Sequence, residues 1–130
     1  FCAFDPKTNI LRYAGANNSI FIIRNTTGTP ELTELKPTRN PIGIYHAEIA
    51  FKMHAVEIVP GDLLYLFSDG LIDQFSERNE KFKRIRFKKL LLEIAHQSMA
   101  EQKRIITETF NAWKGKHMQI DDLVVIGIRF

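Results

Sequence analysis

The feature that most constrains this chain is an unbroken apolar run that ends at an acidic turn. Residues 63–67 (LLYLF) are all apolar, and residues 68–70 (SDG) follow directly. A short continuous apolar run bounded by turn residues is typical of a strand that is covered on both faces. We therefore predict a buried strand that delivers Asp69 to a turn at one end of the core.

The sequence before this run has the pattern of strands joined by turns. Its strand-like segments are apolar or alternating, and the turns between them are rich in proline, glycine and asparagine. Residues 36–46 contain Pro37, Pro41 and Gly43, which predicts a loop. The predicted strands are residues 2–4, 10–14, 19–24, 31–35 and 47–58.

The pattern changes to helical spacing after the acidic turn. Apolar residues recur at helical intervals through residues 87–95. Ser98, with Glu101 three residues later, forms a capping-box pattern for a second helix that ends before Gly115. Residues 121–130 begin with two acids and continue as an apolar run, which predicts a final buried strand.

This order of strands, helices and a last strand indicates one α+β domain over residues 1–130 with a mainly antiparallel sheet. With 45% hydrophobic and 25% charged residues, the composition is ordinary for a soluble globular protein. No apolar run reaches the roughly 18 residues that span a bilayer, so we expect no direct membrane contact. The single cysteine, Cys2, excludes an internal disulfide and suits a cytoplasmic location. The chain opens inside an apolar alternation without an initiator methionine, so we expect it to be a piece of a longer protein.

A basic stripe supplies much of the net charge of +3. Nucleic-acid binding would need this stripe together with aromatic or recognition-helix features. A solvated helix face explains the same residues, and we favour it, so we expect no nucleic-acid partner. The stripe consists of Arg78, Lys81, Lys83, Arg84, Arg86, Lys88 and Lys89.

Acidic residues stand at the ends of two predicted strands. Asp69 and Asp73 lie four residues apart, so they share one face if the chain turns helical there. Asp121 and Asp122 begin the last strand. If the strands are neighbours, the carboxylates converge and need a cation, for which oxygen ligands favour Mg²⁺ or Mn²⁺ over zinc. An Asp-Gly turn and a polar pair before a strand are also ordinary, so pattern alone leaves both interpretations open.

Four segments taken together resemble one family. Residues 60–73 (PGDLLYLFSDGLID) resemble the protein phosphatase 2C-like (PPM) superfamily, and more narrowly its bacterial branch typified by the stage II sporulation protein E phosphatase. Residues 13–18 (YAGANN), 40–44 (NPIGI) and 121–125 (DDLVV) are similar to three further motifs of that branch, in the same order and spacing. Each motif alone is weak, but four in order are specific, and they span nearly the whole chain.

This resemblance implies a metal-dependent serine/threonine phosphatase of bacterial signalling, with an antiparallel β-sandwich flanked by helices. It implies that Asp69 and Asp121 are ligands of a Mg²⁺ or Mn²⁺ pair and that Asp73 helps to hold an additional metal. Gly70 would let the backbone turn tightly beside the metals, and Asp122 would support the site. In this chemistry two ions activate a water that attacks phosphorus, so no protein nucleophile is needed.

One motif of the family is absent from the sequence, namely an aspartate followed by Gly-His-Gly before a helix. The resemblance places it upstream, so we expect this chain to be the C-terminal portion of the phosphatase domain, with the N-terminal part missing. Such a portion alone would bind metal weakly and be nearly inactive. Its uncovered sheet edges would favour self-association, for example as a homodimer.

The resemblance also implies partners. The expected substrate is a phosphoprotein, such as an anti-sigma-factor antagonist in sigma factor regulation, and an upstream sensor domain is expected in the full-length chain. The alternative is a non-catalytic regulatory or protein-binding domain that keeps the fold without turnover. The upstream sequence would discriminate the two, since an aspartate with Gly-His-Gly supports the enzyme and its replacement supports the alternative.

Overall fold

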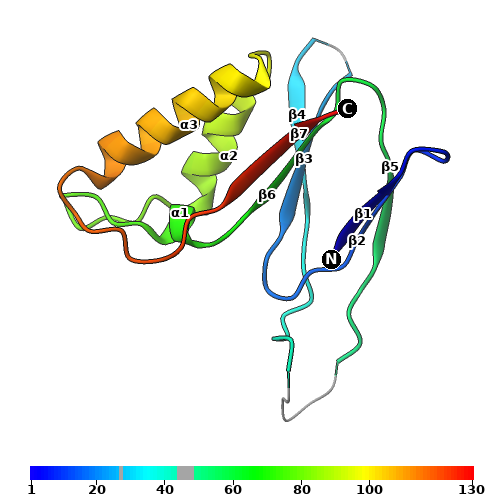
Figure 1. Ribbon diagram of the computed structural model, residues 1–130, viewed down its shortest axis with the longest axis horizontal. Coiled ribbons are helices and arrows are strands. Elements are labelled where there is room, and N and C mark those ends of the chain that lie inside the picture. Colours follow the sequence, from blue (N-terminus) through cyan, green and yellow to red (C-terminus); the bar gives the residue numbers. More distant parts are fainter. Residues whose placement is uncertain (27, 44–48) are drawn as a thin grey trace.

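The computed structural model describes residues 1–26, 28–43 and 49–130. Its elements form three layers, with two long helices on one side, a four-stranded sheet in the middle and a three-stranded sheet on the other side (Figure 1). The helices are α1 (Gly70–Asp73), α2 (Arg84–Ile94) and α3 (Met99–Lys114). The strands are β1 (Cys2–Asp5), β2 (Ile10–Tyr13), β3 (Ile20–Asn25), β4 (Pro30–Leu35), β5 (His54–Glu57), β6 (Leu63–Phe67) and β7 (Val125–Arg129).

Both sheets are antiparallel throughout. The strand order is β1-β2-β5 in the smaller sheet and β4-β3-β6-β7 in the larger one. This arrangement confirms the predicted α+β class and the antiparallel sandwich flanked by helices. The end of β6 and the start of β7 are neighbours, because Phe67 pairs with Val125. The two predicted acidic segments therefore lie at the same end of the larger sheet.

The larger sheet separates two hydrophobic cores, which explains why β6 is apolar without interruption. Leu63, Tyr65 and Phe67 of β6 pack in the core under the helices, whereas Leu64 packs in the core between the sheets. Burial of one large apolar side chain contributes about 1.5–3 kcal/mol. Strand β6 is therefore fixed from both faces, as its sequence predicts, and so is the position of the residues that follow it.

Helix α3 begins and ends where its sequence signals predict. The Ser98 hydroxyl accepts a hydrogen bond from the Glu101 amide at 3.2 Å, and Gly115 caps the other end with a φ of 54°. The capping box is only half formed, because the Glu101 carboxylate binds Arg104 instead of turning back to Ser98. In the part of the chain that the structure describes, no helix combines the length and apolarity that a bilayer crossing requires.

A partly buried ion cluster fastens α2 to the larger sheet. The Glu34 carboxylate on β4 binds Arg84 and Lys88 of α2 at 2.6 Å each, and accepts a hydrogen bond from the Ser19 hydroxyl at 2.7 Å. Burial alone raises the pKa of Glu34, but the hydrogen bonds from Lys88, Ser19 and Arg84 outweigh it and hold the pKa at about 2. Glu34 therefore stays ionised at neutral pH, and the cluster holds α2 in place.

The predicted strand over residues 47–58 is too long. Only β5, from His54 to Glu57, is a strand, because its partner β2 ends at Tyr13, which pairs with His54. Residues 49–53 run as irregular chain, and residues 47 and 48 lie outside the described residues.

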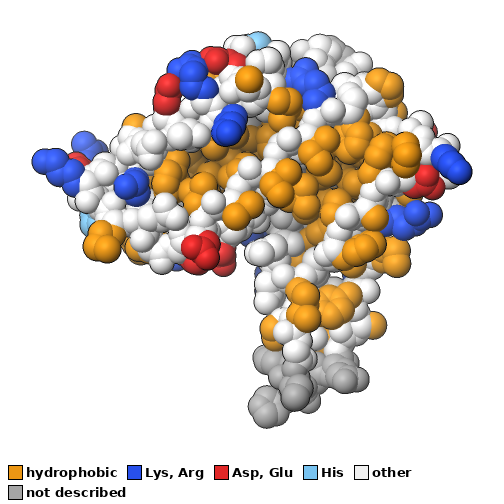
Figure 2. All heavy atoms as spheres, in the orientation of Figure 1, with side chains coloured by type: hydrophobic (Ala, Val, Ile, Leu, Met, Phe, Trp, Pro, Cys, Tyr) orange, Lys and Arg blue, Asp and Glu red, His pale blue; other side chains and the backbone are white. Residues whose placement is uncertain are grey.

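The prediction that the final strand is buried is wrong. Strand β7 lies at the edge of the larger sheet and has a neighbouring strand on one side only. Ile126 and Ile128 of β7 are consequently 50% and 40% exposed, and Val124, which directly precedes the strand, is 50% exposed. Figure 2 shows the broad apolar surface to which this edge belongs.

Candidate functional site

The four sequence motifs meet at one cleft between the two sheets. A cavity of about 350 Å³ lies near the end of β6 and the start of β7. Segments that are far apart in the sequence share its lining. Its walls include Gly15, Ala16 and Asn18 of the first motif, Ile42 of the second, Ser68 of the third and Val124 of the fourth. Ile44, which ends the second motif, lies outside the described residues.

Backbone hydrogen bonds hold the first motif beside Thr38, two residues before the second motif. The Asn17 amide donates to the Thr38 carbonyl at 3.0 Å, and the Thr38 amide donates to the Gly15 carbonyl at 2.9 Å. A Cβ on Gly15 would overlap the side chain of Tyr13, whose hydroxyl donates to the Asn18 carbonyl. The YAGANN turn is therefore a fixed wall of the cleft rather than a mobile loop.

Ser68 fastens the start of the closing strand to the end of β6. Its hydroxyl donates to the Asp122 carbonyl at 2.8 Å and accepts from the Val124 amide at 2.9 Å. The Ser68 amide also donates to the Val124 carbonyl at 3.0 Å. The Asp121–Asp122 pair is thus held beside the segment that carries Asp69.

Gly70 lets the two acid-bearing segments touch. A Cβ on Gly70 would overlap the Asp122 carbonyl oxygen and would lie 3.3 Å from the Asp121 carbonyl oxygen. Gly70 is buried as the first residue of α1 and does not have a positive φ. Glycine is therefore required by the close approach of the other backbone, and not by the tight turn that the resemblance implied.

The predicted acids all lie at this end of the molecule, but they differ in their hydrogen-bond and ion-pair partners. Asp69 is exposed and precedes α1, but its carboxylate makes no capping hydrogen bond. Asp121 and Asp122 are also exposed, and the Asp121 carboxylate accepts the Asp122 amide at 2.7 Å. Asp73 ends the same helical turn, and its carboxylate binds Lys81 at 2.9 Å. A group of acidic side chains is visible beside α1 in Figure 2.

These carboxylates fit part of a Mg²⁺ or Mn²⁺ site. Within the described residues Asp69 and Asp121 have no ion-pair partner, and their segments meet at Gly70. Carboxylate oxygen is the ligand type that both ions prefer. However, no three His, Cys, Asp or Glu side chains in the described ranges come together as a metal-binding group. The two acids are therefore suited to contribute to a site that needs further ligands, and their role as ligands stays a prediction.

The basic stripe is largely engaged by its neighbours. These contacts partly neutralise the positive charge of the stripe, so less of it remains to attract a nucleic acid. This supports the interpretation of the stripe as a solvated helix face. The absence of a nucleic-acid partner stays a prediction. The contacts are Arg84 and Lys88 with Glu34, Lys81 with Asp73, Lys89 with Glu93, and Arg86 with the Trp113 ring.

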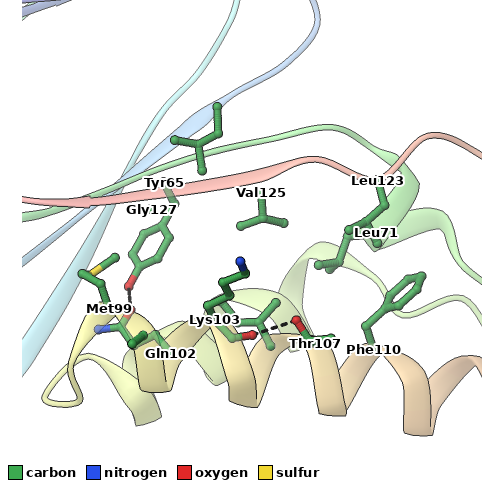
Figure 3. Close-up of a pocket in the computed structure, with 13 residues that line it drawn as sticks. Tyr65, Leu71, Met99, Gln102, Lys103, Thr107, Phe110, Leu123, Val125 and Gly127 are labelled. Carbon is green, nitrogen blue, oxygen red and sulfur yellow. Dashed lines mark hydrogen bonds between the residues drawn. The ribbon is translucent and has the colours of Figure 1, made fainter.

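A second recess lies between α3 and the β6–β7 pair (Figure 3). It has a volume of about 630 Å³ and a mainly apolar lining, in which the Tyr65 hydroxyl donates to the Gln102 side chain. Among the described residues that line it there is no acid and no histidine. The described lining of the cleft between the sheets also has no acid and no histidine, but residues of all four motifs line that cleft, so it is the candidate site.

Replacing Gly70 by alanine is expected to push the two acid-bearing segments apart. Alanine favours a helix, so any loss must come from the overlap of its methyl group with the Asp122 carbonyl. We expect a loss of about 1–3 kcal/mol in the free energy of unfolding. In the full-length protein we expect Mn²⁺ affinity to fall about 10-fold or more. Chemical denaturation and calorimetric Mn²⁺ titration measure the two effects.

Gly127→Ala is the matched control for this substitution. An added Cβ there meets the flexible end of Met99 and the ring of Tyr65, away from the acids. It should affect stability but leave Mn²⁺ affinity unchanged. Unchanged affinity in Gly70→Ala as well would contradict the proposed role of Gly70.

Comparison with known proteins decides the family. The family model for stage II sporulation protein E (SpoIIE) matches residues 1–130 of the chain. The chain belongs to the SpoIIE family. The solved SiaA-PP2C domain of Pseudomonas aeruginosa is similar to it, with 31% identity and a TM-score of 0.85 over 97% of this chain and 48% of that one. A comparison with curated proteins found no match.

Two structures of Bacillus subtilis SpoIIE share the fold at lower identity. The PP2C phosphatase domain with a fragment of the regulatory domain has 16% identity and a TM-score of 0.73, covering 99% of this chain and 36% of that one. The phosphatase domain in a crystal form without domain swapping has 20% identity and a TM-score of 0.58, covering 92% and 49%. This SpoIIE-family chain thus has a PP2C-like fold and spans about half, or less, of the chains that it matches.

Sequence pattern assigns no role to two polar residues beside the acids of this SpoIIE-family chain. Ser68 appears only as part of its motif, and Gln74 stands outside every motif. Ser68 could have been singled out, because it is a polar residue that lies directly between a buried strand and an acid. Gln74 has no comparable signal, because its contacts are with backbone atoms about 40 residues later.

Proposed function

We propose that the full-length protein is a metal-dependent phosphoprotein phosphatase of bacterial signalling, and that it hydrolyses phosphoserine or phosphothreonine. The observation that carries this proposal is the meeting of all four motifs at one cleft, beside the segments that carry Asp69 and Asp121, two acids that have no ion-pair partner in the described residues. Membership of the SpoIIE family supports it. The substrate that we propose is a phosphorylated anti-sigma-factor antagonist, and the sensory input comes from an upstream domain.

The roles proposed for this chain follow from position. Asp69 and Asp121 hold Mg²⁺ or Mn²⁺ together with further ligands, and the ions supply Lewis-acid activation of water and neutralise phosphoryl charge. Ser68 and Gly70 keep the two segments in contact, and Asp122 supports the site through its backbone. The cleft receives the phosphorylated side chain and excludes bulk water from it. Asp73 binds an additional ion only when its ion pair with Lys81, at 2.9 Å, is broken.

The second candidate is a non-catalytic regulatory or protein-binding domain. One observation favours it, namely that the described residues do not assemble three metal-binding side chains. Both candidates place the protein in the cytoplasm without direct membrane contact, and both allow a homodimer. They differ in turnover, which an assay can measure.

The deciding experiment is hydrolysis of a small aryl phosphate and of a phosphoprotein by the full-length protein. We expect turnover with Mn²⁺ or Mg²⁺, loss of turnover on chelation, and recovery when the metal is restored. Turnover that survives chelation would contradict metal dependence. No turnover of either substrate with either metal would favour the regulatory alternative.

A further inference from the structure

We propose that Gln74 is a positioning residue that sets the place of the acid-bearing segment 118–122, and thereby of Asp121 relative to Asp69. The inference rests on the proposed function in one respect, since it assigns Asp121 to the metal. Gln74 directly follows α1 and is completely buried. Its side chain reaches the backbone of the loop that leads into Asp121.

The Gln74 carboxamide binds this loop as a neighbouring strand would. Its Nε2 donates to the Met118 carbonyl at 3.0 Å, and its Oε1 accepts the Ile120 amide at 3.4 Å. Residues two apart in an extended chain present a carbonyl and an amide to the same side, and a carboxamide has one donor end and one acceptor end. One glutamine side chain therefore fixes both the position and the direction of this stretch.

Gln74 is itself held in place by several hydrogen bonds, so its side chain can fix the position of the loop. Its carbonyl accepts hydrogen bonds from the Trp113 indole at 3.1 Å and from the Phe82 amide at 2.9 Å. Its Nε2 makes a second hydrogen bond, to the Phe75 carbonyl at 3.2 Å. The residue thus connects α1, α3 and the loop before β7.

Apolar packing contributes little to the position of the loop. The side chains of Met118 and Ile120 are 83% and 54% exposed. Among the described residues, the other hydrogen bonds from outside the segment lie near its two ends, where the Lys116 amide donates to Glu77 at 3.0 Å and the Ser68 hydroxyl donates to the Asp122 carbonyl. Within the segment, the Gln119 side chain donates to the Asp121 carbonyl at 2.8 Å. In the part of the chain that the structure describes, Gln74 makes the hydrogen bonds between these ends that come from outside the loop, so the path of residues 118–120 depends on it.

Gln74→Met in the full-length protein tests the proposal, because methionine keeps the length and packing of the side chain and removes its hydrogen bonds. The loop is exposed, so its freed backbone groups can bind water. We expect amide exchange in residues 118–122 to rise about five-fold or more through easier local opening. We expect the Kd for Mn²⁺, measured by calorimetry, to rise about 10-fold or more. Gln74→Asn, which cannot reach both backbone groups, should show the same changes.

Gln102→Met is the matched control. Gln102 is equally buried, accepts the Tyr65 hydroxyl and donates to the Gln97 carbonyl at 3.0 Å, but it does not touch the loop. It should lower the unfolding temperature without changing exchange at 118–122 or Mn²⁺ affinity. This comparison separates a positioning role from a general loss of stability.

Each outcome decides the inference. Unchanged exchange at 118–122 in the Gln74 variants overturns it, and so does an equal effect of Gln102→Met. Faster exchange with unchanged Mn²⁺ affinity overturns the link to the site, and failure of both Gln74 variants to fold shows a core residue instead. If the wild-type protein does not bind Mn²⁺, the proposed function fails, while the exchange result still decides the contact with the loop.

Discussion

Asp69→Asn is expected to lower the Mn²⁺-dependent phosphatase activity that we propose for the full-length protein by about 100-fold or more. Asparagine has almost the same shape, so the fold should be retained while one negative charge is lost. Asp69 is exposed and does not cap α1 through its side chain, so its carboxylate has no structural role in the described residues that could explain a loss. The rate at saturating Mn²⁺ and the Mn²⁺ concentration for half activation are both measured.

Asp121→Asn should reproduce this loss if the two acids serve one site. Glu93→Gln is the matched control, because it removes the same charge from an exposed acid whose only ion pair, among the described residues, is with Lys89 at 3.8 Å. It should retain wild-type activity. Full activity in Asp69→Asn would remove this residue from the site, and activity that recovers at high Mn²⁺ would show a role in affinity alone.

Arg24→Met is expected to destabilise the protein by about 3–5 kcal/mol, because it leaves a buried charge without its partner. Asp62 is 1% exposed and binds Arg24 through two nitrogens, at 2.6 and 2.9 Å. Arg24 also donates to the Glu57 carbonyl at 2.7 Å, and the Asp62 carboxylate accepts the Val59 amide at 3.0 Å. The pair therefore joins β3, the end of β5 and the turn before β6.

Urea denaturation measures this loss, with the midpoint and the slope fitted separately. The double variant Arg24→Met/Asp62→Asn should recover part of it, because the unpaired charge is then gone. Arg12→Met, at an exposed position on β2, controls for the loss of a surface cation. A change below about 1 kcal/mol in Arg24→Met would show that water reaches Asp62 and that the pair behaves as a surface pair.

Much of the fold follows from local sequence pattern. The apolar run of β6 predicts burial on both faces because each of its side chains enters one of two cores. The limits of α3 follow from Ser98 and Gly115, whose preferences depend only on nearby backbone. The resemblance that the four motifs carry predicts that Asp69 and Asp121 belong to one site, and their segments do meet at Gly70.

The rest depends on partners that sequence pattern does not reveal. Residues 123–126 (LVVI), which lead into and begin β7, are as apolar as β6, yet the exposure of β7 is decided by its place at the sheet edge. The pairing of Arg24 with Asp62 and that of Gln74 with Met118 join residues about 40 positions apart, with no periodicity to mark them. The need for glycine at position 70 comes from the Asp122 backbone, which the residues around Gly70 do not specify.

The pairing of β6 with β7 has a consequence for how the molecule folds. Leu63 pairs with Arg129, so the chain between the two paired strands contains all three helices. By contrast, short turns join β1 to β2 and β3 to β4. Contacts between residues distant in sequence carry a larger loop-closure entropy and tend to form late. The two acidic segments should therefore come together only after the hairpins and helices have formed. Partly folded molecules would then have native secondary structure but no metal-binding site, and metal would bind only to the completed fold.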